Sequence, residues 1–240
     1  MNTLLLAPSE LAAAADGVVR LAADRRLRHV RAVHRAAAGT VLRVGVLGGR
    51  LGRATVVRID DTGLDLAVVL DREPPPPAPL TLVLALPRPK VVRRVFQAVA
   101  ALGVKRLCLV AAWRVEKSYW ESPLLAAAAV TAELVLGLEQ AGDTVLPAVT
   151  LHRRFKPFVE DELPAIVAGT RGFVAHPPAA GRCPCDLAAP ATLAIGPEGG
   201  FIGYEVDALE RQGLAAVSLG PRVLRVEQAL PALVARLCGP

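Results

Sequence analysis

Two short stretches near the C-terminal end place glycine, proline and charged side chains directly after apolar runs. The first is G-P-E-G-G at residues 196–200, and the second is L-G-P-R-V-L-R at residues 219–225. Consecutive glycines in the first stretch permit positive φ and a close approach of the backbone to a ligand. Its Glu198 can accept hydrogen bonds from a ribose hydroxyl, an ammonium group or free backbone N–H groups. From these residues alone, a ligand-binding loop and an ordinary turn with its helix cap are equal alternatives.

The second stretch places two aliphatic residues between two arginines. Val223 and Leu224 suit the face of a planar base, whereas Arg222 and Arg225 suit a phosphate or a developing anion. The alternative is a loop whose arginines only neutralise nearby carboxylates. Glu227 follows at a predicted helix start, where the helix dipole favours a carboxylate in any case.

The elements around both stretches alternate between apolar strands and amphipathic helices. The predicted strands are residues 80–86, 106–112, 145–149, 172–176, 192–195 and 215–219, and the predicted helices are residues 90–102, 122–141, 164–168, 204–212 and 227–237. Strands that alternate with helices predict an α/β fold with a mostly parallel sheet. Open sheets of this kind bind ligands beyond the carboxyl ends of their strands, and both stretches occupy that position.

Residues 1–72 show a different pattern, with short strands that are typical of a small barrel. The clearest strands, at 40–46, 53–59 and 63–69, are separated by glycine turns, and shorter elements are predicted at 3–7, 11–15 and 24–33. The run E-P-P-P-P-A-P at 73–79 is a stiff, extended linker. We therefore expect two domains, at residues 1–72 and 80–240.

The net charge of +6 favours a polyanionic partner. Its densest cluster lies between residues 20 and 35, where the basic residues are Arg20, Arg25, Arg26, Arg28, His29, Arg31, His34 and Arg35. Only Asp24 opposes them within this segment. The cluster indicates contacts with RNA phosphates or, alternatively, a solvated helix face.

Missing motifs exclude several classes of protein. The sequence has no G-x-G-x-x-G after a strand, no G-x-x-x-x-G-K-[ST], no nucleophile elbow and no H-E-x-x-H. Rossmann dehydrogenases, P-loop NTPases, serine hydrolases and zincins are therefore excluded.

Cys183 and Cys185 are separated by one residue, whereas zinc ribbons use two, so reduced thiols are favoured over a metal site even with His176 nearby. No signal peptide or membrane span is evident, which predicts a cytoplasmic protein without a membrane partner.

Together the two stretches resemble a known family. G-P-E-G-G-F followed by L-G-P-R-V-L-R-V-E is similar to the C-terminal signature of the SPOUT superfamily of S-adenosylmethionine-dependent RNA methyltransferases, and most similar to the ribosomal RNA small subunit methyltransferase E family. Further resemblance is found in R-H-V at 28–30, V-L-R-V at 41–44, L-P-R-P-K at 86–90, L-G-V at 102–104, E-Q at 139–140 and A-H-P at 175–177. The resemblance thus covers the whole chain.

The resemblance implies a fold and a reaction. The fold would be a C-terminal SPOUT-type α/β domain with a deep trefoil knot, preceded by a small PUA-like, RNA-binding β-barrel. The enzyme would use S-adenosylmethionine to methylate N3 of a specific uridine in small-subunit (16S) ribosomal RNA. Its partners would be that RNA or the assembled small subunit, and a second copy of the chain in a homodimer.

The resemblance also implies site residues. The methyl donor would contact Ala175, His176, Gly196, Pro197, Glu198, Gly199, Gly200, Leu219, Gly220, Val223 and Leu224. Arg225 would lie nearest the reacting uridine, with Glu227 orienting it. RNA would contact Arg25, Arg28, His29, Arg31 and Arg222. Because arginine is almost always protonated, we expect Arg225 to stabilise a developing uridinate and not to act as a general base.

The sequence departs from the family pattern at a few positions. Val226 and Gln228 replace the threonines that are usual there, and W-R-V-E-K-S-Y-W at 113–120 is unlike the common form of that loop. Two alternatives to the uridine N3-methyltransferase stay open. One is a ribose 2′-O-methyltransferase of the same superfamily, and the other is a non-catalytic protein that binds RNA or assists ribosome assembly.

Overall fold

The computed structural model of the chain describes residues 2–15, 17–177, 179 and 181–239. Contacts between residues divide the chain into two compact units, the first made of Met1–Pro76 with Val135–Leu146 and the second of Pro77–Leu134 with Pro147–Pro240. Residues 73–77 are extended and belong to no strand. Residues 78–79, expected in the linker, begin a strand, and residues 135–146, expected in the second domain, group with the first unit.

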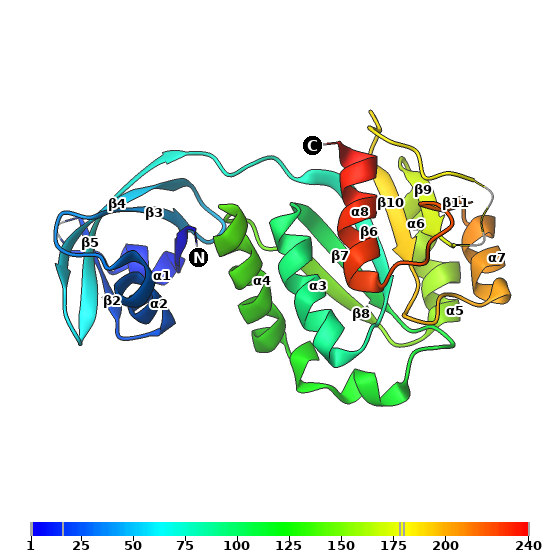
Figure 1. The fold of residues 1–240 in the computed structure, drawn as a ribbon, viewed down its shortest axis with the longest axis horizontal. Helices are drawn as coiled ribbons and strands as arrows, with labels where there is room; N and C mark the ends of the chain where they lie inside the picture. Colours follow the sequence, from blue (N-terminus) through cyan, green and yellow to red (C-terminus); the bar gives the residue numbers. More distant parts are fainter. Residues whose placement is uncertain (1, 16, 178, 180, 240) are drawn as a thin grey trace. The chain divides into compact units, whose positions relative to one another are not determined.

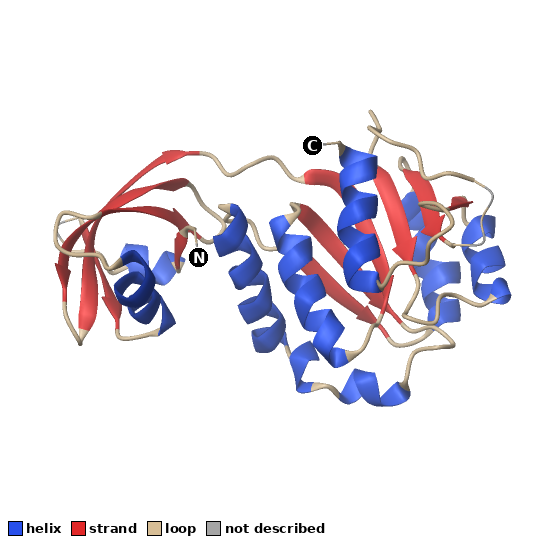
Figure 2. Ribbon diagram, viewed as in Figure 1, coloured by secondary structure: helices blue, strands red, loops and turns tan. Residues whose placement is uncertain are grey.

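The first unit contains a five-stranded sheet (Figure 2). Its strands, in their spatial order, are β1 (Leu4–Leu6), β3 (Val41–Val46), β4 (Leu51–Ile59), β5 (Gly63–Arg72) and β2 (Val18–Ala22). β1 pairs with β3 in parallel, and the other pairs are antiparallel. Among the described residues β1 and β2 are the two edges of this order, so closure into a barrel stays a prediction.

Two short helices, α1 (Pro8–Ala12) and α2 (Arg25–His29), belong to the same unit, and α2 continues in a π-helical turn at Val30–His34. Asp24 caps α2, because its carboxylate accepts the backbone N–H groups of Arg26 at 2.7 Å and Leu27 at 3.3 Å. The helix predicted at 24–33 is thus present. Strand β2 is not among the predicted elements, because V-V-R-L-A lacks a strict alternation of apolar and polar residues, although its side chains alternate in burial.

A half-buried cluster of three charged side chains holds α1 and α2 together. Arg26 donates to the Glu10 carboxylate at 2.5 and 2.8 Å and to Asp24 at 2.8 Å, and also to the Leu5 carbonyl at 2.9 Å. The hydrogen bonds from Arg26 hold the pKa of the Glu10 carboxyl below its ordinary value of 4.5. Burial raises the pKa of Asp24, but the hydrogen bonds from Arg26 outweigh it, and the pKa falls below 3.8.

We expect this cluster to make the first unit sensitive to acid. A carboxyl group whose folded pKa is depressed stabilises the fold above its unfolded pKa, and that contribution is lost as the pH falls through the folded pKa. The unfolding temperature of the wild type, measured by circular dichroism, should therefore fall as the pH drops below 4.5, the ordinary pKa of Glu10. The Glu10→Gln variant should be less stable at neutral pH and lose less on acidification. Asp61→Asn, at an 88% exposed carboxylate, should behave as the wild type, and equal acid sensitivity of all three proteins would contradict the assignment.

The second unit is built on a six-stranded sheet in which every pair is parallel (Figure 2). Its strands, in their spatial order, are β11 (Leu214–Val217), β9 (Arg171–Ala175), β10 (Ala191–Ile195), β6 (Ala78–Ala85), β7 (Val104–Val110) and β8 (Ala148–His152). Leu82, Leu107 and Leu193 in its central strands are fully buried, as near-continuous apolar runs predict for a sheet covered on both faces. The strand predicted at 145–149 begins later than expected, at Ala148.

The remaining helices are α3 (Pro89–Ala101), α4 (Ala127–Ala141), α5 (Phe155–Pro157), α6 (Leu163–Val167), α7 (Gly203–Arg211) and α8 (Val226–Cys238). α3 and α8 lie side by side and pack on β7, β6 and β10, whereas α6 and α7 contact β9, β10 and β11 (Figure 1). The helix predicted at 122–141 begins only at Ala127, because Ser122 caps a separate 3₁₀ turn at Pro123–Leu125. Within the described part of the chain, none of the helices has the length and apolar character that crossing a membrane requires.

Candidate functional site

The segments that follow β9, β10 and β11 meet at the carboxyl edge of the parallel sheet. His176 donates its backbone N–H to the Val217 carbonyl at 2.9 Å and so ties the end of β9 to the end of β11. A pocket opens among the three segments, with about 650 Å³ of empty space including its open mouth. It is lined by Ala175, His176, Pro177, Ile195, Gly196, Pro197, Glu198, Gly200, Val217, Ser218, Leu219, Gly220, Arg222, Val223, Leu224, Val226, Ala229 and Leu233.

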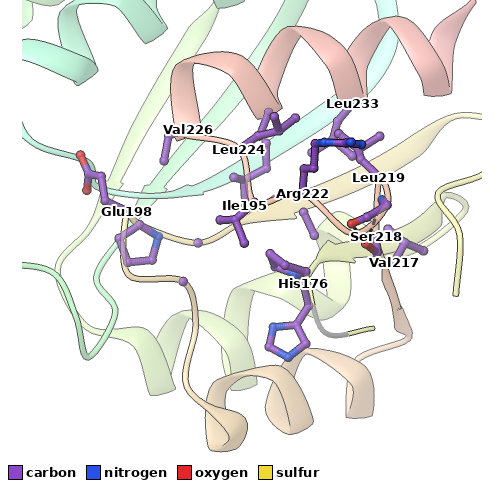
Figure 3. A pocket seen from close by; sticks show the side chains of 18 residues that line it. His176, Ile195, Glu198, Val217, Ser218, Leu219, Arg222, Leu224, Val226 and Leu233 are labelled. Atoms are coloured by element: carbon purple, nitrogen blue, oxygen red, sulfur yellow. Dashed lines mark hydrogen bonds between the residues drawn. The ribbon is translucent and has the colours of Figure 1, made fainter. Parts of the chain in front are cut away.

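Apolar side chains form most of the pocket wall. Ile195, Val226 and Leu233 are almost fully buried, and they come from β10 and α8. In Figure 3, Glu198 lies on one side of Ile195 and Val226, and Arg222 lies on the other. A mostly apolar pocket with a few polar groups at its rim is the usual form of a small-molecule site.

Glycines shape the two loops at positions where a side chain does not fit. Gly200 has a φ of 72° and Gly220 a φ of 131°, which are conformations that residues with a Cβ rarely adopt. At Gly196, an added Cβ would come within 2.8 Å of the Phe201 nitrogen and 3.0 Å of the Gly200 carbonyl carbon. The turn at residues 196–200 therefore depends on glycine for both conformation and space.

Glu198 fastens the first loop to the start of α3. Its Oε1 accepts the backbone N–H of Arg88 at 3.1 Å, and the Arg88 guanidinium approaches the same oxygen at 3.8 Å. Its carboxylate points away from His176 and Leu224 (Figure 3). Of the three kinds of donor expected for Glu198, the structure shows the backbone N–H group.

The residues predicted to contact a methyl donor all line this pocket except Gly199. The Gly199 carbonyl instead accepts a hydrogen bond from the Arg114 guanidinium. Arg222, predicted to contact RNA, also lines the pocket. The two stretches at 196–200 and 219–225 thus form two walls of one pocket.

The predicted catalytic pair lies beside the pocket and not in its wall. Arg225 is the exposed N-cap residue of α8, and its backbone N–H donates to Gln228 Oε1 at 3.4 Å. Glu227 lies in the first turn of α8, as expected. In the described part of the chain its ion-pair partner is Arg94 of α3, at 3.9 Å, and not Arg225.

The two departures from the family pattern have visible structural roles. Val226 is buried in the pocket wall. The Gln228 side chain accepts the backbone N–H of Arg225 and so caps the first turn of α8. Both residues therefore support the loop that carries Arg225.

Much of the charge in the N-terminal basic cluster is neutralised by carboxylates from elsewhere in the first unit. Arg25 forms a bidentate pair with Glu139, at 2.7 and 2.8 Å, and this carboxylate is only 1% exposed. Arg20 pairs with Asp65 at 2.7 Å. These partners lie far from residues 20–35 in the sequence, so the segment by itself did not reveal them.

The other predicted RNA contacts of the first unit differ in their surroundings. Arg31 pairs with the exposed Asp61. Arg28 is exposed and forms no ion pair within the described residues. The His29 ring packs edge-on against His34, with ring centroids 5.3 Å apart. Arg28 is therefore the member of this set most available to a phosphate.

A second basic surface was not predicted, and it lies at the carboxyl edge of the six-stranded sheet. Exposed arginines follow successive strands there: Arg88 after β6, Arg114 after β7, Arg154 after β8, and Arg222 and Arg225 after β11. This surface could have been predicted from the sequence, because each arginine comes shortly after a predicted strand. Because parallel strands end at one edge, these cations lie along the edge of the sheet at which the pocket opens.

In the part of the chain that the structure describes, no three His, Cys, Asp or Glu side chains are grouped to hold a metal ion. Cys183 is buried, and its burial raises the pKa of its thiol. Cys185 is exposed. A raised pKa keeps Cys183 in the unreactive thiol form.

A buried carboxylate joins the start of α7 to the loop after β7. Glu205 is 3% exposed, and it accepts the Ile202 N–H at 3.0 Å and the Trp113 N–H at 2.7 Å. Ile202 lies two residues beyond Gly200, the last glycine of the pocket loop, so Glu205 holds the end of that loop in place. Its side chain was not singled out in the sequence.

Replacing Glu205 with alanine should destabilise the protein by about 2–4 kcal/mol, because the backbone N–H groups of Ile202 and Trp113 lose the charged acceptor that they share. Urea denaturation monitored by circular dichroism measures this free energy of unfolding. The control is Glu210→Ala, at an exposed position of the same helix, which should stay within about 0.5 kcal/mol of wild type. Similar losses for the two variants would contradict the role of Glu205.

A parallel sheet with an apolar pocket beyond the carboxyl ends of its strands defines an α/β protein that binds a small ligand at that edge. A model of the RNA methyltransferase domain family matches residues 74–238. Ribosomal RNA small subunit methyltransferase E of Treponema pallidum (strain Nichols) is 30% identical over 214 residues, which cover 86% of this chain and 79% of that protein. The chain belongs to the RNA methyltransferase family, and within it to the ribosomal RNA small subunit methyltransferase E family.

Solved structures share the fold over nearly the whole chain. A methyltransferase from Legionella pneumophila with bound S-adenosylmethionine has a TM-score of 0.72 at 22% identity, covering 98% of this chain and 94% of that one. A ribosomal RNA small subunit methyltransferase E from Neisseria gonorrhoeae, bound to S-adenosyl methionine, has a TM-score of 0.71 at 19% identity, covering 98% and 95%. The predicted α/β fold of this family is thereby confirmed.

Proposed function

We propose that this chain transfers a methyl group from S-adenosylmethionine to N3 of a uridine in small-subunit ribosomal RNA. The observation that carries the proposal is the pocket, because its walls are the two loops that define the family signature. The reaction class follows from membership in the RNA methyltransferase family. The proposal adds the target atom, which is N3 of uridine.

The pocket residues fit the methyl donor. The apolar wall of Ile195, Leu224 and Leu233 suits an adenine ring, and the glycine loop at 196–200 lets the backbone approach a ribose or amino-acid group. When bound, S-adenosylmethionine supplies an electrophilic methyl group on a sulfonium centre. The chain's part is to hold that group toward the basic edge where RNA binds.

Arg225 is proposed as the catalytic residue nearest the uridine. The N3–H of uridine is a weak acid, so methyl transfer requires negative charge to develop on the base. A guanidinium beside the pocket stabilises that charge. Because arginine does not accept a proton, the N3 proton passes to solvent water as the N3–C bond forms and the bond from the methyl group to sulfur breaks. Glu227 and Gln228 would position Arg225 by fixing the first turn of α8, through the contacts with Arg94 and with the Arg225 N–H.

RNA is proposed to bind across the arginines at the carboxyl edge of the sheet and at Arg28 of the first unit. Guanidinium groups bind phosphates bidentately, and the exposed arginines around the pocket supply them. The PUA-like barrel of residues 1–72, the trefoil knot of the SPOUT-type domain and the homodimer are further parts of the proposal, and the family relationship supports them.

Mass spectrometry of ribosomal RNA nucleosides, from cells with and without the gene, tests this function. Loss of 3-methyluridine is the expected result. Loss of a ribose-methylated nucleoside would replace uridine N3 by a 2′-hydroxyl as the target. Unchanged nucleosides, together with no binding of S-adenosylmethionine in calorimetry, would identify a non-catalytic RNA-binding protein.

A further inference from the structure

Trp113 exposes its indole to solvent in a chain that is poor in aromatic residues. Aromatic residues make up 4% of the sequence, and it has two tryptophans. Trp113 is 79% exposed. The other, Trp120, is 7% exposed and lies beneath the Arg153 guanidinium, 5.6 Å from its ring centroid. Burial of an aromatic ring of this size usually stabilises a fold, so an exposed tryptophan on a fixed backbone suggests contact with a partner.

The backbone that carries Trp113 is held on both sides. Its own N–H donates to the buried Glu205 carboxylate at 2.7 Å. The next residue, Arg114, donates to the Gly199 carbonyl, and its stem packs so closely that a Cβ on Gly199 would come within 2.9 Å of Arg114 Cδ. Val115 beyond it is buried. The backbone of this loop is therefore anchored, whereas the indole of Trp113 is exposed to solvent.

The position of Trp113 is beside the proposed methyl-transfer site. Trp113 follows β7, which pairs with β6, and β6 pairs with β10, so its loop leaves the same edge of the parallel sheet as the pocket loops. Arg114 contacts Gly199 between two residues that line the pocket, Glu198 and Gly200. The exposed Arg88 is joined to Glu198 at the same place. An exposed ring flanked by guanidinium groups is the usual arrangement for binding single-stranded nucleic acid.

We infer that Trp113 is a stacking platform for an unpaired base of the RNA substrate, next to the pocket. The inference rests on the proposed function, since it presupposes an RNA substrate. Enzymes that modify RNA bases act on unstacked nucleotides, and an exposed aromatic face replaces the lost stacking. Arg114 and Arg88 would bind the flanking phosphates. Trp113 would thus contribute to RNA affinity and not to the binding of the methyl donor.

Fluorescence tests the contact directly. In a Trp120→Phe protein, Trp113 is the sole tryptophan, and its emission reports on stacking. Titration with a single-stranded oligouridylate should quench this emission to a plateau. Emission that stays unchanged throughout the titration would overturn the inference.

Kinetics supply the second readout. Trp113→Ala should weaken RNA binding roughly 5- to 100-fold, which is the range for loss of one stacked base. The effect should fall on KM for RNA, with kcat and the affinity for S-adenosylmethionine unchanged. Trp113→Phe keeps a ring and should recover most of the loss. A wild-type KM for Trp113→Ala, with methylation intact, would overturn the platform and leave the proposed function standing.

Failure of the proposed methylation reaction would give a different set of results. If no RNA is methylated but oligouridylate still quenches Trp113, the proposed reaction fails and the platform stands. Sedimentation velocity separates RNA from a protein partner. If Trp113→Ala converts a dimer to a monomer and leaves RNA affinity unchanged, the indole belongs to an interface between copies, and the inference is overturned.

Discussion

Replacing Gly196 with alanine is expected to weaken binding of S-adenosylmethionine roughly 10- to 100-fold. The added Cβ would lie 2.8 Å from the Phe201 nitrogen and 3.0 Å from the Gly200 carbonyl carbon. Both are backbone atoms, so the loop must shift as a whole to relieve the clash. That loss of affinity corresponds to about 1.4–2.7 kcal/mol, which lies within the range that overpacking of this kind costs. Isothermal titration calorimetry measures it.

The matched control is Gly203→Ala, seven residues further along the same loop–helix segment. A Cβ at Gly203 meets no atom within 4 Å, and the residue begins α7 without a positive φ. This variant should bind S-adenosylmethionine as the wild type does. The unfolding temperature of Gly196→Ala must be measured beside it, because affinity is compared only between folded proteins. Wild-type affinity of folded Gly196→Ala would contradict the role of this loop.

Removal of the Arg225 side chain is expected to lower kcat about 100- to 1000-fold, as loss of one preorganised donor to a developing anion does. Arg225 is exposed beside the pocket, and its backbone is fixed by Gln228. Arg225→Ala should therefore fold normally and bind S-adenosylmethionine with wild-type affinity. Single-turnover methylation of RNA with a radioactive methyl donor measures the chemical step.

Two comparisons make the Arg225 result specific. Arg225→Lys keeps the positive charge without the planar fork of donors, so partial activity is expected. Arg211→Ala removes another exposed arginine, on α7, where it donates to the Asp207 carbonyl; its kcat should match that of the wild type. Full turnover by Arg225→Ala would exclude electrostatic stabilisation by this residue.

Prediction from the sequence succeeded where a signal is local. Apolar runs and the glycine and proline residues that end them located all six strands of the parallel sheet, with shifts of a few residues. The paired loops at 196–200 and 219–225 pointed to one ligand site, because strands of a parallel sheet share an edge. β2 was missed, since V-V-R-L-A lacks a strict alternation of apolar and polar residues.

Prediction was weakest where a side chain has a distant partner. Arg25 is a predicted RNA contact, and the sequence did not reveal its pairing with the buried Glu139, more than a hundred positions away. The sequence also did not reveal that Glu227, which is expected to position Arg225, forms its ion pair with Arg94 on another helix. The basic edge formed by arginines of four separate segments was not predicted, because those segments come together only in the folded sheet.

The sequence by itself determined the α/β class, the family and the residue types of the two pocket loops, because each depends on short-range patterns of apolar, glycine and charged residues. Tertiary structure decided which charges are free and which are neutralised, since ion pairs join residues that the chain separates widely. It also decided the environment of Trp113. Only the fold anchors that backbone through Glu205 and Gly199 while leaving the indole exposed beside the pocket.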